Sequence, residues 1–302
     1  MNETCSPGTG ITAGRRPNSN RMSFRKSDCL ITAILVAATG FLFQPVFAWI
    51  ARETLAHEQL RQSLSLMLFA AIFVVFDKWG KLKPAFELSN ANLAFLLLSF
   101  ILATSTFLFR SPYIILAALG LAVLALSRIV FGSRALPIYL PFAITFGAFL
   151  LFILFFPVAD WPLRVLAGRY ASQILEQIGV GATLAMLDIP APVLLMLVEE
   201  QTFEVAAECN GFGVISTSLL LSLLLTVSRN MPLWWKAAGV ALAGGVGFGF
   251  NIARIICIVL LAPYFPDHYD VMHETVGLIA LFGALGAVWL LIGGGEIRKK
   301  PK

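Results

Sequence analysis

The chain has 302 residues, of which 58% are hydrophobic and 13% charged, and its formal net charge is +5. Its mean hydropathy of +0.84 is too high for a soluble domain and is typical of helical membrane proteins. The positive charges occur in short clusters between apolar runs, as they do in the cytoplasmic loops of membrane proteins. The sequence therefore predicts an all-α polytopic membrane protein, and the net charge does not indicate a nucleic acid partner.

The cysteines and histidines do not form a metal-binding pattern. The four cysteines contain no CxxC pair, and the three histidines are scattered along the chain. A catalytic zinc site usually needs three protein ligands. We therefore expect neither a metal site nor another cofactor.

The first half of the chain predicts five transmembrane helices. Residues 1–27 are rich in Gly, Ser, Asn and Arg and predict a basic cytoplasmic tail. The next run, Leu30–Ile50, begins like a signal peptide, but it exceeds the roughly 7–15 apolar residues of one and is interpreted as the first span. Four further runs approach the ~20 residues that a bilayer requires. They lie at about 60–76, 91–109, 112–131 and 136–156, which completes the region 28–156.

The segment 157–210 interrupts this rhythm. It begins with Pro157 and Pro162, which disturb a helix. The stretch Ala167–Leu187 then has apolar residues at helical spacing and predicts an amphipathic helix at the membrane interface, with a sixth full span as the alternative. Acidic residues predominate, which indicates an extracytoplasmic segment. Two short pieces are predicted to be extended: Val193–Val198 and Thr202–Ala207.

Three more spans are predicted within residues 211–293, before a basic cytoplasmic tail at 294–302. They are Phe212–Val227, Ala237–Leu261 and Thr275–Ile292. About eight spans with both termini inside would place every basic cluster in the cytoplasm. In the seventh span, a small-residue face favours close helix packing, and it consists of Gly244, Gly245, Gly247 and Gly249. Gly245 and Gly249 have the small-xxx-small spacing.

This topology brings three polar residues to the extracytoplasmic boundary. Cys209 begins the sixth span, His273 begins the eighth, and Arg254 lies in the outer half of the seventh. A charge within a span costs at least ~2.5 kcal/mol and normally faces a bundle interior or a cavity. The alternative for Arg254 is a snorkelling or structurally paired side chain. Asn251 lies one turn away on the same helix face, so it is placed to line the same cavity.

Cys209 is the predicted nucleophile. A lone cysteine is more often a small buried hydrophobe, but this one lies between Glu208 and Asn210 at a helix start, where N–H groups stabilise a thiolate. Cys257 is surrounded by Ile, Val and Leu and is interpreted as a packing residue. Glu208, Asn210 and Asn251 are the additional substrate-binding candidates.

His273 is the predicted proton shuttle, since imidazole is the usual acid or base beside a nucleophile. Its rival, His268, lies in a loop with turn-forming residues, whereas His273 lies at a helix start. Gly277, one turn later, is small enough to let another backbone approach. Arg254 stays protonated and cannot act as a base, so we expect it to stabilise an oxyanion. Together these residues predict cysteine acyl transfer.

Three motifs carry a family resemblance. Phe203–Gly211 (FEVAAECNG), Asn251–Arg254 (NIAR) and His273–Gly277 (HETVG) resemble the exosortase/archaeosortase family of membrane transpeptidases. The likeness covers roughly residues 150–292, with the same motif order and topology. Family members usually have Ser after the cysteine, where this chain has Asn210.

The resemblance implies a site of Cys209, Arg254 and His273 that recognises a C-terminal sorting signal, made of a short motif, a spanning helix and basic residues. The enzyme would cut exported proteins near the motif, hold them as a thioester on Cys209 and pass them to an acceptor. It would be a multi-pass protein of the bacterial inner membrane, in contact with membrane lipid, with its site on the extracytoplasmic face. Two alternatives stay open. One is a transporter or exopolysaccharide-assembly component with a cavity lined by Arg254 and Asn251, and the other is a protease that hydrolyses its thioester.

Overall fold

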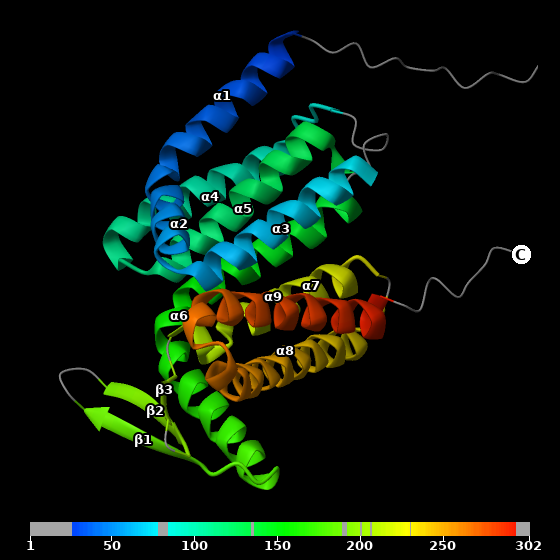
Figure 1. Ribbon diagram of the computed structural model, residues 1–302. Coiled ribbons are helices and arrows are strands. Elements are labelled where there is room, and N and C mark those ends of the chain that lie inside the picture. Colours follow the sequence, from blue (N-terminus) through cyan, green and yellow to red (C-terminus); the bar gives the residue numbers. More distant parts are fainter. Residues whose placement is uncertain are drawn as a thin grey trace, which may run out of the picture.

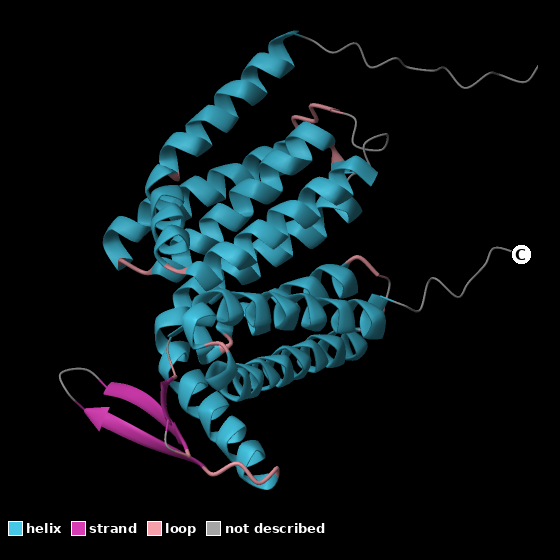
Figure 2. Cartoon of the chain, in the orientation of Figure 1, coloured by secondary structure: helices cyan, strands magenta, loops and turns pink. Residues whose placement is uncertain are grey.

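The computed structural model describes residues 26–77, 84–133, 136–188, 192–199, 201–205, 207–229 and 231–293. These residues form a helical bundle with a small antiparallel sheet at one end (Figures 1 and 2). The predicted basic tails, 1–27 and 294–302, lie outside the described residues, except that α1 begins at Lys26.

Each predicted span corresponds to a helix or to a pair of helices. The helices are α1 (Lys26–Leu42), α2 (Gln44–Ala56), α3 (Glu58–Asp77), α4 (Asn90–Phe109), α5 (Pro112–Phe131), α6 (Leu136–Gln177), α7 (Phe212–Val227), α8 (Leu233–Leu261) and α9 (Tyr269–Val288). Among the described residues, four helical segments are long and apolar enough to cross a membrane, and the bent pair α1–α2 adds a fifth. The protein is therefore a multi-pass, mainly helical membrane protein, while a total of eight spans stays a prediction.

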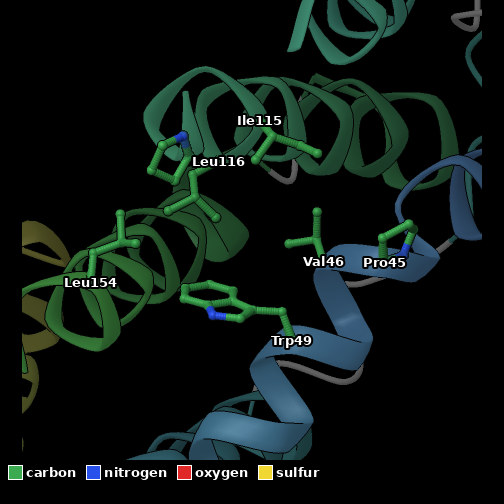
Figure 3. A pocket seen from close by; sticks show the side chains of 7 residues that line it. Pro45, Val46, Trp49, Ile115, Leu116 and Leu154 are labelled. Atoms are coloured by element: carbon green, nitrogen blue, oxygen red, sulfur yellow. The ribbon is translucent and has the colours of Figure 1, made fainter. Parts of the chain in front are cut away.

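The first predicted span, Leu30–Ile50, is broken rather than straight. The chain bends by 58° between α1 and α2, and Pro45 occupies the first turn of α2. Proline lacks an N–H donor and fits the first turn of a helix, so it begins a new helix more readily than it continues one. Beside the bend lies an apolar cavity of about 280 Å³ between α2, α5 and α6, where Trp49 points toward Leu154 (Figure 3).

The predicted interruption at Pro157 and Pro162 is wrong, because α6 continues through both prolines. Proline is tolerated inside membrane helices where surrounding groups satisfy the freed backbone atoms. The helix therefore extends beyond the predicted span at 136–156. Its second half runs past α8 toward the sheet (Figure 1).

The prediction of one helix over Ala167–Leu187 is correct only as far as Gln177. Gly179 has a positive φ of 89°, a conformation that glycine adopts without steric cost, and it turns the chain into strand β1 (Ala182–Asp188). Strand β1 pairs antiparallel with β2, and β2 pairs antiparallel with β3. The two predicted extended pieces correspond to β2 (Pro192–Val198) and to the first part of the second piece, β3 (Gln201–Glu204).

The sheet is anchored by one face of α6. Ala167, Ala171 and Leu175 recur every four residues and are completely buried, as expected for an amphipathic helix. They pack in one apolar cluster with Met196 of β2 and Ile255 of α8. Helix α6 thus connects the sheet to the same helix that carries Arg254.

Of the four glycines of α8 that were predicted to favour close helix packing, Gly247 makes the tightest contact with α7. A Cβ atom at Gly247 would lie 2.9 Å from the Cα of Ile215, whereas no atom of the described residues lies within 4 Å of a Cβ at Gly245 or Gly249. The prediction is therefore confirmed for Gly247, and for Gly244, where a Cβ atom would lie 3.4 Å from Leu219, but it is wrong for Gly245 and Gly249. Residues 245 and 249 share one face of the helix, and 247 lies on the opposite face.

The fold gathers three helix ends at the end of the bundle that carries the sheet. The start of α7, the last turns of α8 and the start of α9 lie there together (Figure 1). Polar residues at these ends are consequently neighbours, although they are far apart in the sequence.

Candidate active site

Cys209 lies in a short 3₁₀ helix, Ala207–Asn210, directly before α7. Its side chain is nearly buried, with 9% exposed. The following residue, Gly211, has a φ of 77°, and a Cβ atom there would lie 2.4 Å from Cγ of Asn251. Only glycine fits both conditions. The Cys-Asn-Gly sequence thus forms the tight turn that places the thiol at the mouth of α7.

His273 and Arg254 complete a contiguous group with the thiol. The Nε2 atom of His273 lies 3.8 Å from Sγ of Cys209 and 3.4 Å from Nη2 of Arg254. A guanidinium group can only donate hydrogen bonds. Since a hydrogen bond from Arg254 requires an unprotonated Nε2, this contact favours the tautomer that can accept the proton of the thiol.

Two residues of α9 lie against His273 and Arg254. Tyr269 lies one turn before His273, and their rings stack with centroids 5.9 Å apart and planes 29° apart. Gly277 lies one turn after His273, and a Cβ atom there would lie 3.3 Å from Cζ, Nε and Nη2 of Arg254. The expected close approach at Gly277 is therefore made by a guanidinium side chain.

A polar cavity of about 420 Å³ opens beside His273 and Arg254, between α3, α8 and α9. Glu274 lines it from α9. The first turns of α3 supply four polar residues that sequence reasoning did not assign to the site: Glu58, Gln59, Arg61 and Gln62. The only sequence signal for them is a polar run at the start of an otherwise apolar helix.

A second, narrower cleft of about 20 Å³ is lined by Cys209 itself. Its other walls include Phe203 of β3 and Tyr269 of α9. The sulfur atom therefore has the sheet on one side and His273, with the polar cavity beyond it, on the other. The narrow cleft has room for about one water molecule, so the polar cavity is the only one of the two openings wide enough for a peptide.

Asn251 and Asn210 are both completely buried. The Nδ2 atom of Asn251 donates a hydrogen bond of 3.0 Å to the carbonyl oxygen of Cys209. The Oδ1 atom of Asn210 accepts a hydrogen bond of 2.7 Å from the N–H of Phe212, and its Nδ2 donates to Asp160 of α6. The structure thus gives these two predicted substrate-binding residues contacts within the protein. The side chain of the third, Glu208, lies outside what the structure describes.

Neither rival residue lines either of these two openings. Cys257 is a free cysteine exposed on α8, so its interpretation as a packing residue was wrong. His268 is exposed in the 3₁₀ turn Pro266–His268. Among the described residues, no group of three His, Cys, Asp or Glu side chains is placed to hold a metal ion. The contact between the Cys209 thiol and the His273 imidazole suits proton transfer and nucleophilic attack by a thiol.

Comparison with protein-family models gives a match to the family described as transmembrane exosortase (Exosortase_EpsH), over residues 36–290. This range extends from within α1 to the end of α9, and so includes the first half of the chain as well as the motifs. Searches of curated proteins and of solved structures gave no match.

Proposed function

Because the chain belongs to the transmembrane exosortase family, we propose that it is an integral-membrane cysteine protease and transpeptidase. It cleaves a C-terminal sorting signal from exported proteins through a thioester and transfers them to an acceptor. The observation that supports this proposal most directly is the contact of the Cys209 thiol with His273, which in turn contacts Arg254.

In the first step, Nε2 of His273 accepts the thiol proton of Cys209, and the thiolate attacks the scissile carbonyl carbon. The carbonyl oxygen becomes an oxyanion, which Arg254 stabilises by donating hydrogen bonds. The C–N bond then breaks, and His273 returns its proton to the departing amine. The exported protein is left as a thioester on Cys209.

In the second step, the acceptor attacks the thioester carbonyl and gives its proton to His273. The C–S bond breaks, the new bond to the acceptor forms, and the thiolate regains a proton from the imidazolium. Arg254 stabilises the second oxyanion in the same way. Water in place of the acceptor would give simple hydrolysis of the thioester.

The polar cavity is the proposed location of the polar residues around the scissile bond. It is bounded by His273 and Arg254, and its acidic and basic side chains, such as Glu274 and Arg61, can form hydrogen bonds with a peptide. We place the site on the extracytoplasmic face of the inner membrane, because the charge pattern of the loops puts the starts of α7 and α9 there. A membrane-impermeant thiol reagent tests this placement: it should label a variant that retains only Cys209 in spheroplasts and should not label one that retains only Cys29.

The decisive experiment compares cysteine variants during processing of a co-expressed exported protein that ends in a sorting signal. We expect Cys209→Ala and Cys209→Ser to abolish processing, since a serine hydroxyl without a tuned base does not replace a thiol. Cys257→Ala, on the neighbouring helix, is the matched control and should process normally. In the wild type, mass spectrometry should find a hydroxylamine-sensitive acyl group on Cys209.

Normal processing by Cys209→Ser would contradict a thiol mechanism and favour a transporter or an assembly component. Loss of processing in Cys257→Ala at normal abundance would transfer the nucleophile role to that residue. Membrane abundance of each variant, measured by immunoblot, separates lost chemistry from lost protein.

A further inference from the structure

A buried polar chain connects α6 to the residue after the nucleophile. Asn210 is completely buried, and its Nδ2 donates a hydrogen bond to Oδ1 of Asp160. Asp160 in turn receives two hydrogen bonds from the guanidinium of Arg164, one turn further along α6. Both Asp160 and Arg164 are about four-fifths buried, with 20% and 19% of their side chains exposed. The hydrogen bond between Asn210 and Asp160 joins two segments that are fifty residues apart in sequence.

This arrangement determines which way the amide of Asn210 points. A carboxylate only accepts hydrogen bonds, so Asp160 must face the Nδ2 donor rather than the Oδ1 acceptor. The amide oxygen is then directed at the N–H of Phe212, where it accepts a bond of 2.7 Å. Asp160 therefore selects the orientation of a buried side chain that closes the turn between Cys209 and α7.

The same contacts determine which backbone N–H groups near Cys209 are available to stabilise an oxyanion. The N–H of Phe212 lies at the N-terminus of α7 and is already bonded to Asn210, so it is not available for an oxyanion. On the other side of the turn, Asn251 holds the carbonyl oxygen of Cys209. The backbone of the nucleophile is consequently held from α8 through Asn251 and from α6 through Asn210.

We propose that Asp160 is a positioning residue for Cys209, acting through Asn210. Asp160 touches neither substrate nor a reacting atom. It fixes the turn that keeps the sulfur within reach of His273, and loss of the Asp160–Asn210 pairing moves the thiol out of alignment. The inference rests on the proposed function, because alignment is defined by that reaction.

A reciprocal exchange tests the pairing. The Asn210→Asp change places two carboxylates against each other with no donor between them. We expect the processing rate to fall on the order of 100-fold, because two like charges this close repel each other. Asp160→Asn keeps an acceptor for Asn210 but loses the charge-assisted bonds, so we expect the processing rate to fall about 10-fold. In the double variant, the amide at 160 donates to the carboxylate at 210, which still accepts the N–H of Phe212. Processing should then recover to within about 10-fold of the wild type.

Two further readouts distinguish positioning from general stability. One is the rate at which a small membrane-permeant thiol reagent alkylates Cys209, and the other is the membrane abundance of each variant. We expect alkylation and processing to change together across the series while abundance changes little. Glu176→Gln, an exposed acid-to-amide change on the same helix, is the matched control and should change none of them.

The proposal is overturned if the double variant is no more active than Asn210→Asp at equal abundance. It is also overturned if the processing rate of Asp160→Ala, normalised to its membrane abundance, is within twofold of the wild-type rate. This second comparison can be made even if Asn210→Asp does not accumulate. Failure of the proposed function would look different. The wild type would then form no thioester on Cys209, while the alkylation series would still show whether the pairing positions the thiol.

Discussion

The Gly277→Ala variant tests whether Arg254 must be held at a precise position or only needs to supply a positive charge. A Cβ atom at position 277 would lie 3.3 Å from three atoms of the guanidinium group, so the planar group must move by a few tenths of an ångström. The Nη2–Nε2 distance between Arg254 and His273 is already 3.4 Å, at the long end for such a bond. Because His273 lies one turn before Gly277 on the same face of α9, a push away from α9 lengthens this contact further.

The expected loss can be estimated from this geometry. Complete removal of an oxyanion donor typically lowers the rate 10²–10³-fold, and a partial displacement should lower it about 10-fold, or about 1.4 kcal/mol. The helix itself should not suffer, since Ala is more favourable than Gly in a helix interior by up to ~1 kcal/mol. Gly286→Ala is the matched control in α9, because no atom of the described residues lies within 4 Å of a Cβ there.

The assay is the initial rate of sorting-signal cleavage per unit of membrane-embedded enzyme, with immunoblots for abundance. We expect Gly277→Ala to accumulate normally and to cleave about tenfold more slowly, and Gly286→Ala to match the wild type. Equal rates in both variants would refute the argument that Arg254 must be held at a fixed distance from His273.

Two further predictions follow from the same contacts. Arg254→Lys keeps the charge without the planar fork, so it should accumulate normally yet lose 10²–10³-fold in cleavage rate. Arg254→Ala should show the same loss. Near-normal cleavage by the lysine variant would mean that Arg254 serves only as a structural cation. Gly211→Ala and Gly179→Ala both place alanine at a positive φ and share a strain of about 1 kcal/mol, but only the first also collides with Asn251. We therefore expect loss of activity in Gly211→Ala alone, and equal activities in the two variants would mean that the turn tolerates the collision.

The positions of the helices were predictable because hydropathy marks where each apolar run begins and ends. The run at 112–131 coincides with α5, and the run at 91–109 begins one residue after the start of α4. The bend after Leu42 and the passage of α6 through Pro157 were not predictable. Both depend on whether neighbouring elements satisfy the freed backbone groups, and hydropathy carries no record of those neighbours.

Strand β1 shows a second limit. The segment Ala182–Asp188 continues the helical spacing of apolar residues from α6, and short apolar runs fit a strand equally well. Its pairing with β2 decides between the two, with Leu184 opposite Met196 and Ala185 opposite Leu195. Strand preference depends on such cross-strand packing more than on the segment itself.

The charge pattern alone predicted that Cys209, Arg254 and His273 share one end of the bundle, and the structure has them in contact. Their catalytic roles stay predictions. The α3 residues beside them were missed for the same reason as Asp160. Sequence spacing relates residues within one helix, and it does not say which helix will pack beside another.

Asn210 shows why this matters for reading polar residues near a membrane site. A polar side chain next to a nucleophile was interpreted as a substrate contact, yet Asn210 is completely buried and both ends of its amide are bonded within the protein. A buried polar group is costly unless it has a partner, so its presence predicts a second polar group as strongly as it predicts a substrate. Asp160, in an otherwise apolar stretch of α6, is the only carboxylate among the described residues that bonds to Asn210. Polar residues that look isolated in separate membrane helices should therefore be tested as partners of one another before either is assigned to the substrate.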